Sequence, residues 1–399
     1  MKLTYRHTRI CAYTGYITQG IVNNLTPLLF VSFQRDFSLT LAHISFLIAL
    51  NFGVQILTDL TAARLGERLD YRPAMVFAHG LTAAGLGCMA FLPFALPSFF
   101  GLCVCTVMCA VGGGLLEVVV SPVVEALPGD EKAASMSLLH SFYSWGQMGV
   151  VLISTAFFLL AGTENWRVLP LLWALVPLGN LFLSAKVPFC RLVEEGEAMP
   201  AGKLFRVGTF WIFLAVMICA GASELAMSQW ASLFAEEGLR VSKTLGDLLG
   251  PCAFAALMGL SRVFFGVMGS RIDLRKFILG SGVLCAFSYL LAVFAPHPVT
   301  ALFGCAICGL SVGIMWPGTF SLATRRFPQG GEAMFALLAL AGDIGCTSGP
   351  ALCGVVAGFG GGLKSGLLAA CVFPIALCVC VLFLRNGKSG NQETGAERK

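Results

Sequence analysis

The sequence predicts an all-α membrane protein with twelve transmembrane helices arranged as two six-helix pseudo-repeats. The first observation is composition: 57% of the 399 residues are hydrophobic and only 12% are charged, whereas a soluble domain typically has about 25% charged residues. The second is that the uncharged runs have lengths close to the roughly 20 residues that cross a bilayer. The third is that sequence patterns of the first half recur in the second. A water-soluble enzyme is therefore excluded.

Runs without charged residues mark the expected spans, because a charged side chain is costly in the hydrocarbon core of a bilayer. The run 73–116 is long enough for two helices, with a turn at 93–97. A polar segment near the midpoint divides the chain into an N-terminal half (1–190), a cytoplasmic linker (191–206), a C-terminal half (207–385) and a polar cytoplasmic tail (386–399). The other expected spans are about 10–33, 41–62, 134–160, 166–185, 205–234, 245–268, 277–294, 299–323, 333–358 and 363–384.

The distribution of basic residues predicts the orientation of these spans. If both termini are cytoplasmic, 21 of the 26 Lys and Arg residues fall on the cytoplasmic side and five on the other. Cytoplasmic loops of membrane proteins carry such an excess of Lys and Arg. We therefore expect a multi-pass protein of the bacterial cytoplasmic (inner) membrane with both ends inside.

A weak internal repeat relates the two halves. The fourth expected helix ends in GGGLLEVVVSP (112–122) and the tenth in GLSVGIMWPG (309–318), which places Pro122 and Pro317 195 residues apart. Two similar six-helix bodies that rock around a central site are the arrangement that an alternating-access carrier needs. The repeat therefore favours a carrier over a channel.

Acidic residues inside the apolar runs are the first candidates for function, because a charge at such a depth costs about 2.5–3.5 kcal/mol and is usually retained for a purpose. Glu117, Glu224 and Asp343 occur in this setting, and the structural alternative is that they tie helices together. Glu117 stands out, since it lies between three glycines and Pro122, which leaves the carbonyl group of Val118 without its helical partner. Uptake of a proton removes most of the cost of burying a carboxylate, so these acids are predicted to couple transport to protons.

His140 is predicted to join the proton-coupling group. At 1.5 Å per residue it lies about 9 Å from the inner end of its helix, and Glu117 lies about 13 Å deep in an antiparallel neighbour. The two side chains are therefore expected to meet directly or through water. The alternative for His140 is an ordinary hydrogen-bonding role within the core.

Amides and aromatic rings at a similar depth fit a polyhydroxylated solute. Amides both donate and accept hydrogen bonds, and aromatic faces cover the C–H faces of a sugar ring. The alternative is interhelical hydrogen bonding and interfacial aromatic belts. The expected substrate-binding residues are Gln19, Asn23, Asn24, Tyr143, Trp145, Gln147, Gln229 and Trp316.

Mixed charges at the cytoplasmic ends of two helices predict a gate. The segment ARLGERLDYR (63–72) contains acids and bases, and RVFFGVMGSRID (262–273) is its counterpart in the second half. Opposed charges there can latch the halves together and separate when they rock, although ordinary positive-inside loops have the same composition. The gate residues are expected to be Glu67, Arg68, Asp70, Arg72, Arg262 and Arg271, with Arg262 also placed to pair with an acid on the eleventh helix.

Several motifs resemble those of the major facilitator superfamily and, within it, the fucose permease group of sugar and proton symporters. The segment 63–72 is similar to the superfamily loop G-x-x-x-D-R-x-G-R-R, with Ala63, Glu67 and Asp70 as departures. GGGLLEVVVSP resembles the helix-four pattern G-x-G-x-x-E-x-x-x-N-P, which implies that Glu117 is the coupling glutamate and places Ser121 on its Asn.

The segment GIVNNLTPLLFVSFQ (20–34) resembles the helix-one pattern G-x-x-N-N-L-N-D, and it retains Asn23 and Asn24. The aspartate of that pattern falls on Pro27 in this chain. This departure leaves one of the family's acids without a counterpart, and Glu224, Asp343 or His140 are the candidates to replace it.

Together these observations predict a secondary active transporter that moves a sugar or related small polar metabolite by alternating access, coupled to protons. The alternative is a proton-driven efflux carrier for amphipathic compounds, which a cavity lined mostly by Phe and Met would favour. No catalytic residues, cofactor, metal or nucleic-acid partner are expected; the five His residues are scattered, and the 16 Cys residues lie mainly in apolar runs. The expected partners are the solute, protons and membrane lipid, with the protein a monomer.

Overall fold

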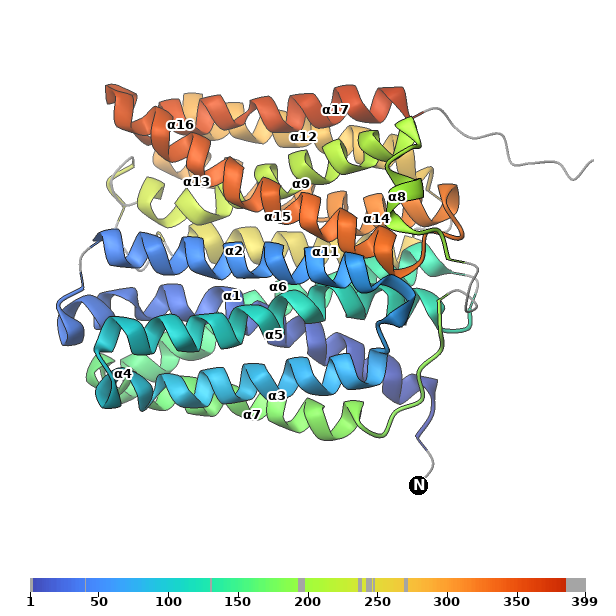
Figure 1. Cartoon of the computed structure of the whole chain (residues 1–399). Helices are drawn as coiled ribbons and strands as arrows, with labels where there is room; N and C mark the ends of the chain where they lie inside the picture. The colour runs from blue at the N-terminus through green and yellow to red at the C-terminus, as the bar shows by residue number, and fades with distance from the viewer. Residues whose placement is uncertain are drawn as a thin grey trace, which may run out of the picture.

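The structure of the protein, a computed structural model, describes residues 3–39, 41–129, 131–192, 198–235, 239–241, 246, 248–268 and 272–384. Every regular element in this part of the chain is helical, and the long helices run roughly side by side (Figure 1). We call the end of the bundle that holds the N-terminus and α8 (Ala201–Leu204) the linker end, and the opposite end the far end. The predicted tail 386–399, residues 193–197 of the predicted linker and Arg271 lie outside the described residues.

The N-terminal half contains six long helices. The predicted run 73–116 is divided as expected, because the short helix α4 (Leu92–Ala95) forms the turn between two of them. The 3-10 turns η1 (Gly66–Arg68) and η2 (Thr163–Asn165) complete the connections. The six are α1 (Tyr5–Phe37), α2 (Leu41–Leu65), α3 (Tyr71–Met89), α5 (Ser98–Ala126), α6 (Lys132–Ala161) and α7 (Val168–Ser184).

The described part of the C-terminal half has the same plan, but four of its six rods are built from more than one helical piece. The predicted span 299–323 is interrupted between α13 (Pro298–Val312) and α14 (Met315–Arg326). The other five are α9 (Gly208–Leu233); η4 (Leu248–Cys252) with α11 (Ala253–Met268); α12 (Leu274–Phe294); α15 (Gly331–Val356), which continues into η6 (Ala357–Gly361); and α16 (Gly362–Ala370) with α17 (Val372–Phe383).

Helix length and surface composition fit a membrane. Eight helical segments in the described part are long and apolar enough to span one by these criteria alone, among them α5, α12 and α15. The 21 residues of α12 extend about 32 Å at 1.5 Å per residue, which matches a hydrocarbon core about 30 Å thick. Large apolar side chains cover the outside, including Phe182 (60% exposed), Trp211 (56%) and Phe303 (59%). The predicted class, an all-α multi-pass membrane protein, is confirmed.

The internal repeat appears in the way that helix ends are formed. Asp70 accepts a hydrogen bond of 3.1 Å from the backbone N–H of Arg72 at the start of α3, the third long helix of its half. Asp273 caps α12, the third of the other half, by accepting a bond of 3.3 Å from the N–H of Lys276. A carboxylate at this position satisfies a backbone donor that has no partner within the helix.

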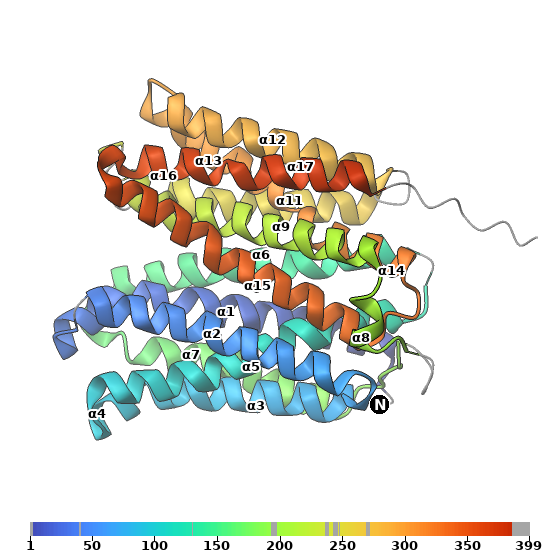
Figure 2. The same ribbon diagram turned by 45° about the horizontal axis from the view of Figure 1, so that its top comes forward.

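The halves meet along two equivalent pairs of helices (Figure 2). The second rod of the N-terminal half, α2, packs on α15, the fifth of the C-terminal half, and α6 and α11 repeat this pairing with the halves exchanged. Such reciprocal contacts are what two pseudo-symmetric bodies produce. A cavity between the halves is therefore flanked by α2, α6, α11 and α15.

Three consecutive glycines allow α5 to lie close to three neighbours. A Cβ atom on Gly112 would lie 2.7 Å from the carbonyl oxygen of Ala78 in α3, and one on Gly113 would lie 3.2 Å from Val22 in α1. On Gly114 it would lie 3.2 Å from Gln55 in α2. Helix packing in membranes depends on such small residues. The glycines thus place the next turn of α5, which carries Glu117, at the meeting point of α1, α2 and the other half.

Candidate functional site

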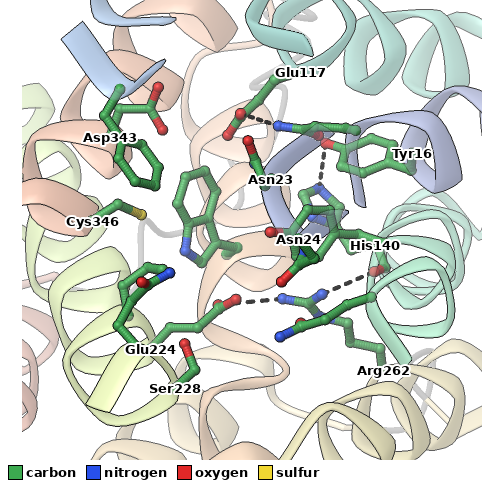
Figure 3. A pocket seen from close by; sticks show the side chains of 17 residues that line it. Tyr16, Asn23, Asn24, Glu117, His140, Glu224, Ser228, Arg262, Asp343 and Cys346 are labelled. Carbon is green, nitrogen blue, oxygen red and sulfur yellow. Dashed lines mark hydrogen bonds and ion pairs between the residues drawn. The ribbon is translucent and has the colours of Figure 1, made fainter. Parts of the chain in front are cut away.

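A cavity lies at the middle of the bundle between the two halves, and both halves supply polar and charged side chains to its wall. Figure 3 shows Glu117, Tyr16 and Asp343 on one side of it and Glu224 and Arg262 on the other. The cavity is lined by Tyr16, Gln19, Asn23, Asn24, Phe52, Glu117, His140, Tyr143 and Gln147 from the N-terminal half, and by Glu224, Leu225, Ser228, Gln229, Arg262, Trp316, Asp343 and Cys346 from the C-terminal half.

Glu117 is buried beside the cavity and is bound by an amide. The Nε2 atom of Gln19, on α1, donates a hydrogen bond to Glu117 Oε2. The Oε1 atom of the same amide is buried and has no hydrogen-bond donor in the described part of the chain. Glu117 is thus held by a neutral group rather than by a cation, which leaves its charge uncompensated whenever it is ionised.

His140 contacts α1 rather than Glu117. Its Nε2 atom lies 3.2 Å from the hydroxyl group of Tyr16, which is also 2.9 Å from Ser121 Oγ on α5. Tyr16 precedes Gln19 by almost one turn of α1, so this helix brings the groups bound to His140 and to Glu117 close together. The expected direct contact of Glu117 with His140 is absent from the described hydrogen bonds, and a relay between them stays a prediction.

Arg262 lies in the cavity wall, buried, and not at the rim where the gate was expected. Its Nη2 atom is 3.4 Å from Glu224 Oε2 on α9, so its acidic partner is on the seventh rod instead of the eleventh. Nη1 donates to the carbonyl oxygen of His140 at 2.9 Å and to Ser144 Oγ at 2.8 Å, across the boundary between the halves. A buried charge requires this many partners, because desolvation is otherwise costly.

The break between α13 and α14 supplies a further acceptor for Arg262. Pro317 lacks the N–H that would bond to the carbonyl group of Gly313, and Arg262 Nε donates to that oxygen at 2.9 Å instead. Trp316 lies at the same break and places its indole ring against Gly342 of α15. The freed carbonyl group that the sequence predicted at Pro122 therefore has an observed equivalent at Pro317, while α5 continues through Pro122.

The predicted amides lie along the same cavity. Asn23 accepts hydrogen bonds through Oδ1 from Gln55 at 3.1 Å and Asn51 at 3.4 Å, which fixes its orientation. Asn24 donates to the carbonyl oxygen of Gly20 at 2.9 Å. Among the predicted binding residues Trp145 is the exception, since it does not line the cavity and its ring lies against Gly259 of α11.

A second, smaller cavity adjoins the first and shares Asn23, Phe52 and Gln229 with it. Its other lining residues include Thr26 and Pro27, which lie further along α1 toward the far end. The central cavity therefore continues toward the far end.

Contacts between the halves close the linker end. The hydroxyl group of Tyr71 at the start of α3 donates to Glu332 Oε1 at the start of α15, at 2.6 Å. Ser137 Oγ on α6 donates to the carbonyl oxygen of Arg262 at 2.7 Å. These two contacts hold the N-terminal and C-terminal halves together at the linker end.

The predicted gate charges take other roles in this state. Arg72 donates to the carbonyl oxygen of Ala185 at 2.6 Å and lies over the ring of Phe189, all within the N-terminal half and the segment after it. Asp70 caps α3, and Arg68 is exposed. The side chain of Glu67, like Arg271, lies outside the described residues.

Asp59 on α2 was missed by the sequence analysis. It is fully buried, and neither carboxylate oxygen has a hydrogen-bond donor in the described part of the chain. The signal was available, because Asp59 lies within the expected span 41–62 and the rule that selected Glu117 applies to it equally. Tyr71 and Glu332 were missed because nothing in the sequence indicates that they meet.

Comparison with known proteins identifies the family. The family model of the Major Facilitator Superfamily matches residues 12–331 and 252–399. This chain belongs to that superfamily. The glucose/mannose transporter GlcP of Bacillus subtilis is 22% identical over 343 residues, which are 80% of this chain and 80% of GlcP. A glucose/galactose transporter of Brucella abortus is 25% identical over 327 residues, 76% of each chain.

A solved structure agrees with this assignment. The Escherichia coli fucose:proton symporter FucP, crystallised in the outward conformation, aligns with a TM-score of 0.79 over 95% of this chain and 99% of FucP. The identity is 16%, so the likeness establishes a common fold. The predicted membership of the superfamily is confirmed, and the protein is a membrane transporter rather than an enzyme.

Proposed function

We propose that this protein carries a monosaccharide across the bacterial cytoplasmic membrane together with protons, by alternating access. The observation that carries the proposal is the central cavity, where amides from one half face Trp316 and Gln229 from the other, beside the buried Glu117. Sugar hydroxyl groups donate and accept at once, as the amides do, and an indole face covers the C–H face of a pyranose. The names of GlcP and of the Brucella abortus transporter support the same substrate class.

The lining of the cavity argues against the efflux alternative. Phe52 is the one Phe among the described lining residues, and Met does not occur there. A carrier of amphipathic compounds needs an extensive apolar surface for its ligand, whereas most of the side chains named here are polar or charged. A sugar fits this cavity wall better than an amphipathic compound does, because each unpaired amide atom can form a hydrogen bond with a sugar hydroxyl group.

The orientation we propose places the linker end in the cytoplasm. The helix ends that carry most of the Lys and Arg residues meet there, including those of α2 and α14, as the positive-inside rule requires. In this orientation the contact between Tyr71 and Glu332 closes the cytoplasmic side. Both walls of the cavity come from one chain, so a monomer is sufficient.

Glu117 provides the coupling in this proposal. Its single described side-chain partner is the neutral amide of Gln19, so an ionised Glu117 has no compensating cation when the cavity closes around it. Proton uptake from the outside makes closure favourable. Release of the proton to the cytoplasm follows when the linker end opens and water reaches the carboxyl group.

The test is transport into right-side-out membrane vesicles. An imposed pH gradient, acidic outside, should drive accumulation of labelled D-glucose, D-galactose or fucose, and extrusion of dyes without sugar uptake would contradict the proposal. Glu117→Gln should abolish the accumulation while sugar exchange at equal pH continues. Glu164→Gln, at an exposed position of η2, is the matched control and should behave like the wild type. Unchanged accumulation by Glu117→Gln would overturn the role of Glu117.

A further inference from the structure

Two buried carboxyl groups face each other across the boundary between the halves. Asp59 belongs to α2 and Asp343 to α15, the helix pair that joins the halves on this side, and their carboxyl groups lie within hydrogen-bonding reach of each other. Asp59 is 0% exposed and Asp343 is 3% exposed. The contact therefore exists only while α2 and α15 remain packed together.

Neither carboxyl group has a compensating donor. Both oxygens of Asp59 and the Oδ2 atom of Asp343 are buried without a hydrogen-bond donor from the described residues. A further acid, Glu117 on α5, interacts electrostatically with both members of the pair. Figure 3 shows Asp343 on the Glu117 side of the cavity, away from Arg262, which is occupied by Glu224.

The remaining titratable or charged groups on the packed helices do not neutralise the pair. Glu332 on α15 accepts from Tyr71, about 16 Å along the helix from Asp343 at 1.5 Å per residue. The basic groups of α2 and the neighbouring elements occupy helix ends rather than the interior; they are the exposed Arg64 in the last turn of α2, Arg68 of η1, Lys203 of α8, Arg325 and Arg326 of α14, and Lys364 of α16.

Two ionised carboxylates in this position would repel each other without solvation, and the usual resolution is that such a pair keeps one proton. One carboxyl group then donates an O–H···O bond to the other, which satisfies oxygens that otherwise have no partner. The polar Oε1 atom of Gln55, one turn before Asp59, is likewise buried without a donor. This turn of α2 therefore contains several buried acceptor oxygens for which the described residues supply no donor.

The position of Asp59 suits a coupling role. Gln55 binds Asn23 of the cavity, and Asp59 is one turn closer to the linker end, about 9 Å from the end of α2 at 1.5 Å per residue. The family aspartate on the first helix is replaced by Pro27 in this chain. A second acid on α2 lies between the sugar cavity and the closed end, where a proton has to pass.

We propose that Asp59 and Asp343 share one proton and form a second proton site, which bridges the halves only in the state that is closed at the linker end. A proton binds from the outer solution as α2 and α15 meet, and it is released to the cytoplasmic solution when they separate and each carboxylate becomes hydrated. The inference rests on the proposed proton-coupled sugar transport, but the shared proton can be tested without transport.

The first test is infrared spectroscopy of the purified wild-type protein in detergent at neutral pH. A protonated carboxyl group has a carbonyl stretch distinct from that of a carboxylate, and Asp59→Asn and Asp343→Asn should each remove or shift part of that band. Asp36→Asn is the matched control, since Asp36 is paired with the cation of Arg35 at 2.6 Å. Superimposable spectra of the wild type and Asp59→Asn would overturn the shared proton, whether or not the protein transports sugar.

The second test is transport by proteoliposomes. Asp59→Asn and Asp343→Asn should each lower pH-driven sugar accumulation to the level seen without a gradient and preserve equal-pH exchange, and the double variant should be no worse than either single variant. Additive losses would contradict a shared site. Accumulation driven by Na⁺ and abolished by Asp59→Asn would overturn the proposal in favour of a cation site.

These outcomes separate the two proposals. If the wild type accumulates no sugar under a pH gradient, the proposed function fails, and the infrared result alone decides the carboxyl pair. If Glu117→Gln abolishes accumulation while Asp59→Asn leaves it unchanged, the proposed function stands and the second proton site is rejected.

Discussion

The hydroxyl group of Tyr71 donates a hydrogen bond of 2.6 Å to Glu332 Oε1 and thereby joins the first turn of α3 to the first turn of α15. Burial raises the pKa of the Tyr71 phenol, and the neighbouring Glu332 raises it further. The phenol therefore remains a donor even at alkaline pH. This bond connects the two halves at the linker end, next to the loop in which the sequence predicted charged gate residues.

Tyr71→Phe should favour the state that is open at the linker end. The substitution removes a hydrogen bond to an acidic group, worth about 1.5–3 kcal/mol, and leaves the buried Glu332 without it. Hydrogen–deuterium exchange in the first turns of α3 and α15 should rise as a result. Tyr13→Phe is the control, because it loses a hydroxyl group but retains the ring that stacks on Phe142. Equal exchange in Tyr71→Phe and the wild type would show that the bond does not close this end.

Arg262→Ala should destabilise the protein far more than Glu224→Gln does. Loss of the arginine leaves Glu224 buried and unpaired, which costs about 3–5 kcal/mol. Loss of the Glu224 charge leaves Arg262 with its acceptors on Gly313, His140 and Ser144. Thermal unfolding of the purified variants measures the difference.

The ion pair itself is tested by the double variant Arg262→Ala/Glu224→Gln. It should recover part of the stability lost in Arg262→Ala, because it contains no unpaired buried charge. A double variant that is as unstable as the sum of the two single changes would contradict direct coupling between these side chains.

The spans were predictable because one length, the thickness of the bilayer, controls them all. The positions at which a span is interrupted were not predictable, since α13 and α14 separate at Gly313 whereas α5 continues through Pro122. Pro122 and Pro317 each remove a helical hydrogen bond. Among the described residues, a buried guanidinium group, that of Arg262, donates to the freed carbonyl oxygen only at Gly313. A side chain distant in the sequence decides the outcome.

The cavity residues were predictable to the extent that helical periodicity was applied. Tyr143 and Gln147 are four residues apart and share a face of α6, and both line the cavity. Trp145 lies between them, about 200° around the helix from each, so it faces α11. Composition and depth alone predict that Tyr143, Trp145 and Gln147 all line the cavity. The pairing of Asp59 with Asp343 depends on how two halves dock, which no local pattern encodes.

Gly342→Ala should weaken sugar binding. A methyl group at this position overlaps the Trp316 ring, and forcing extra volume into a packed contact costs about 1–3 kcal/mol. The indole then moves from its place in the cavity wall, so stabilisation of the purified protein by D-glucose or D-galactose should decrease. Gly53→Ala is the control, since a Cβ atom there meets no neighbour within 4 Å. Unaltered sugar stabilisation in Gly342→Ala would exclude a role for Trp316.

Asp36, at the end of α1, should make stability depend on acid pH. Its Oδ1 atom accepts from Arg35 at 2.6 Å and its Oδ2 atom from the buried Trp166 indole at 2.7 Å. The Arg35 bond is the main cause of its lowered pKa. The folded pKa therefore lies below the unfolded value of about 3.9, so the carboxylate stabilises the fold above that pH and loses this effect as pH falls through the folded pKa. The side chain is 27% exposed, and screening limits the contribution to less than about 1 kcal/mol.

Unfolding temperatures of the wild type and Asp36→Asn should differ at neutral pH and converge below about pH 3, whereas a difference that is constant with pH would assign the effect to packing around Trp166 instead of to charge.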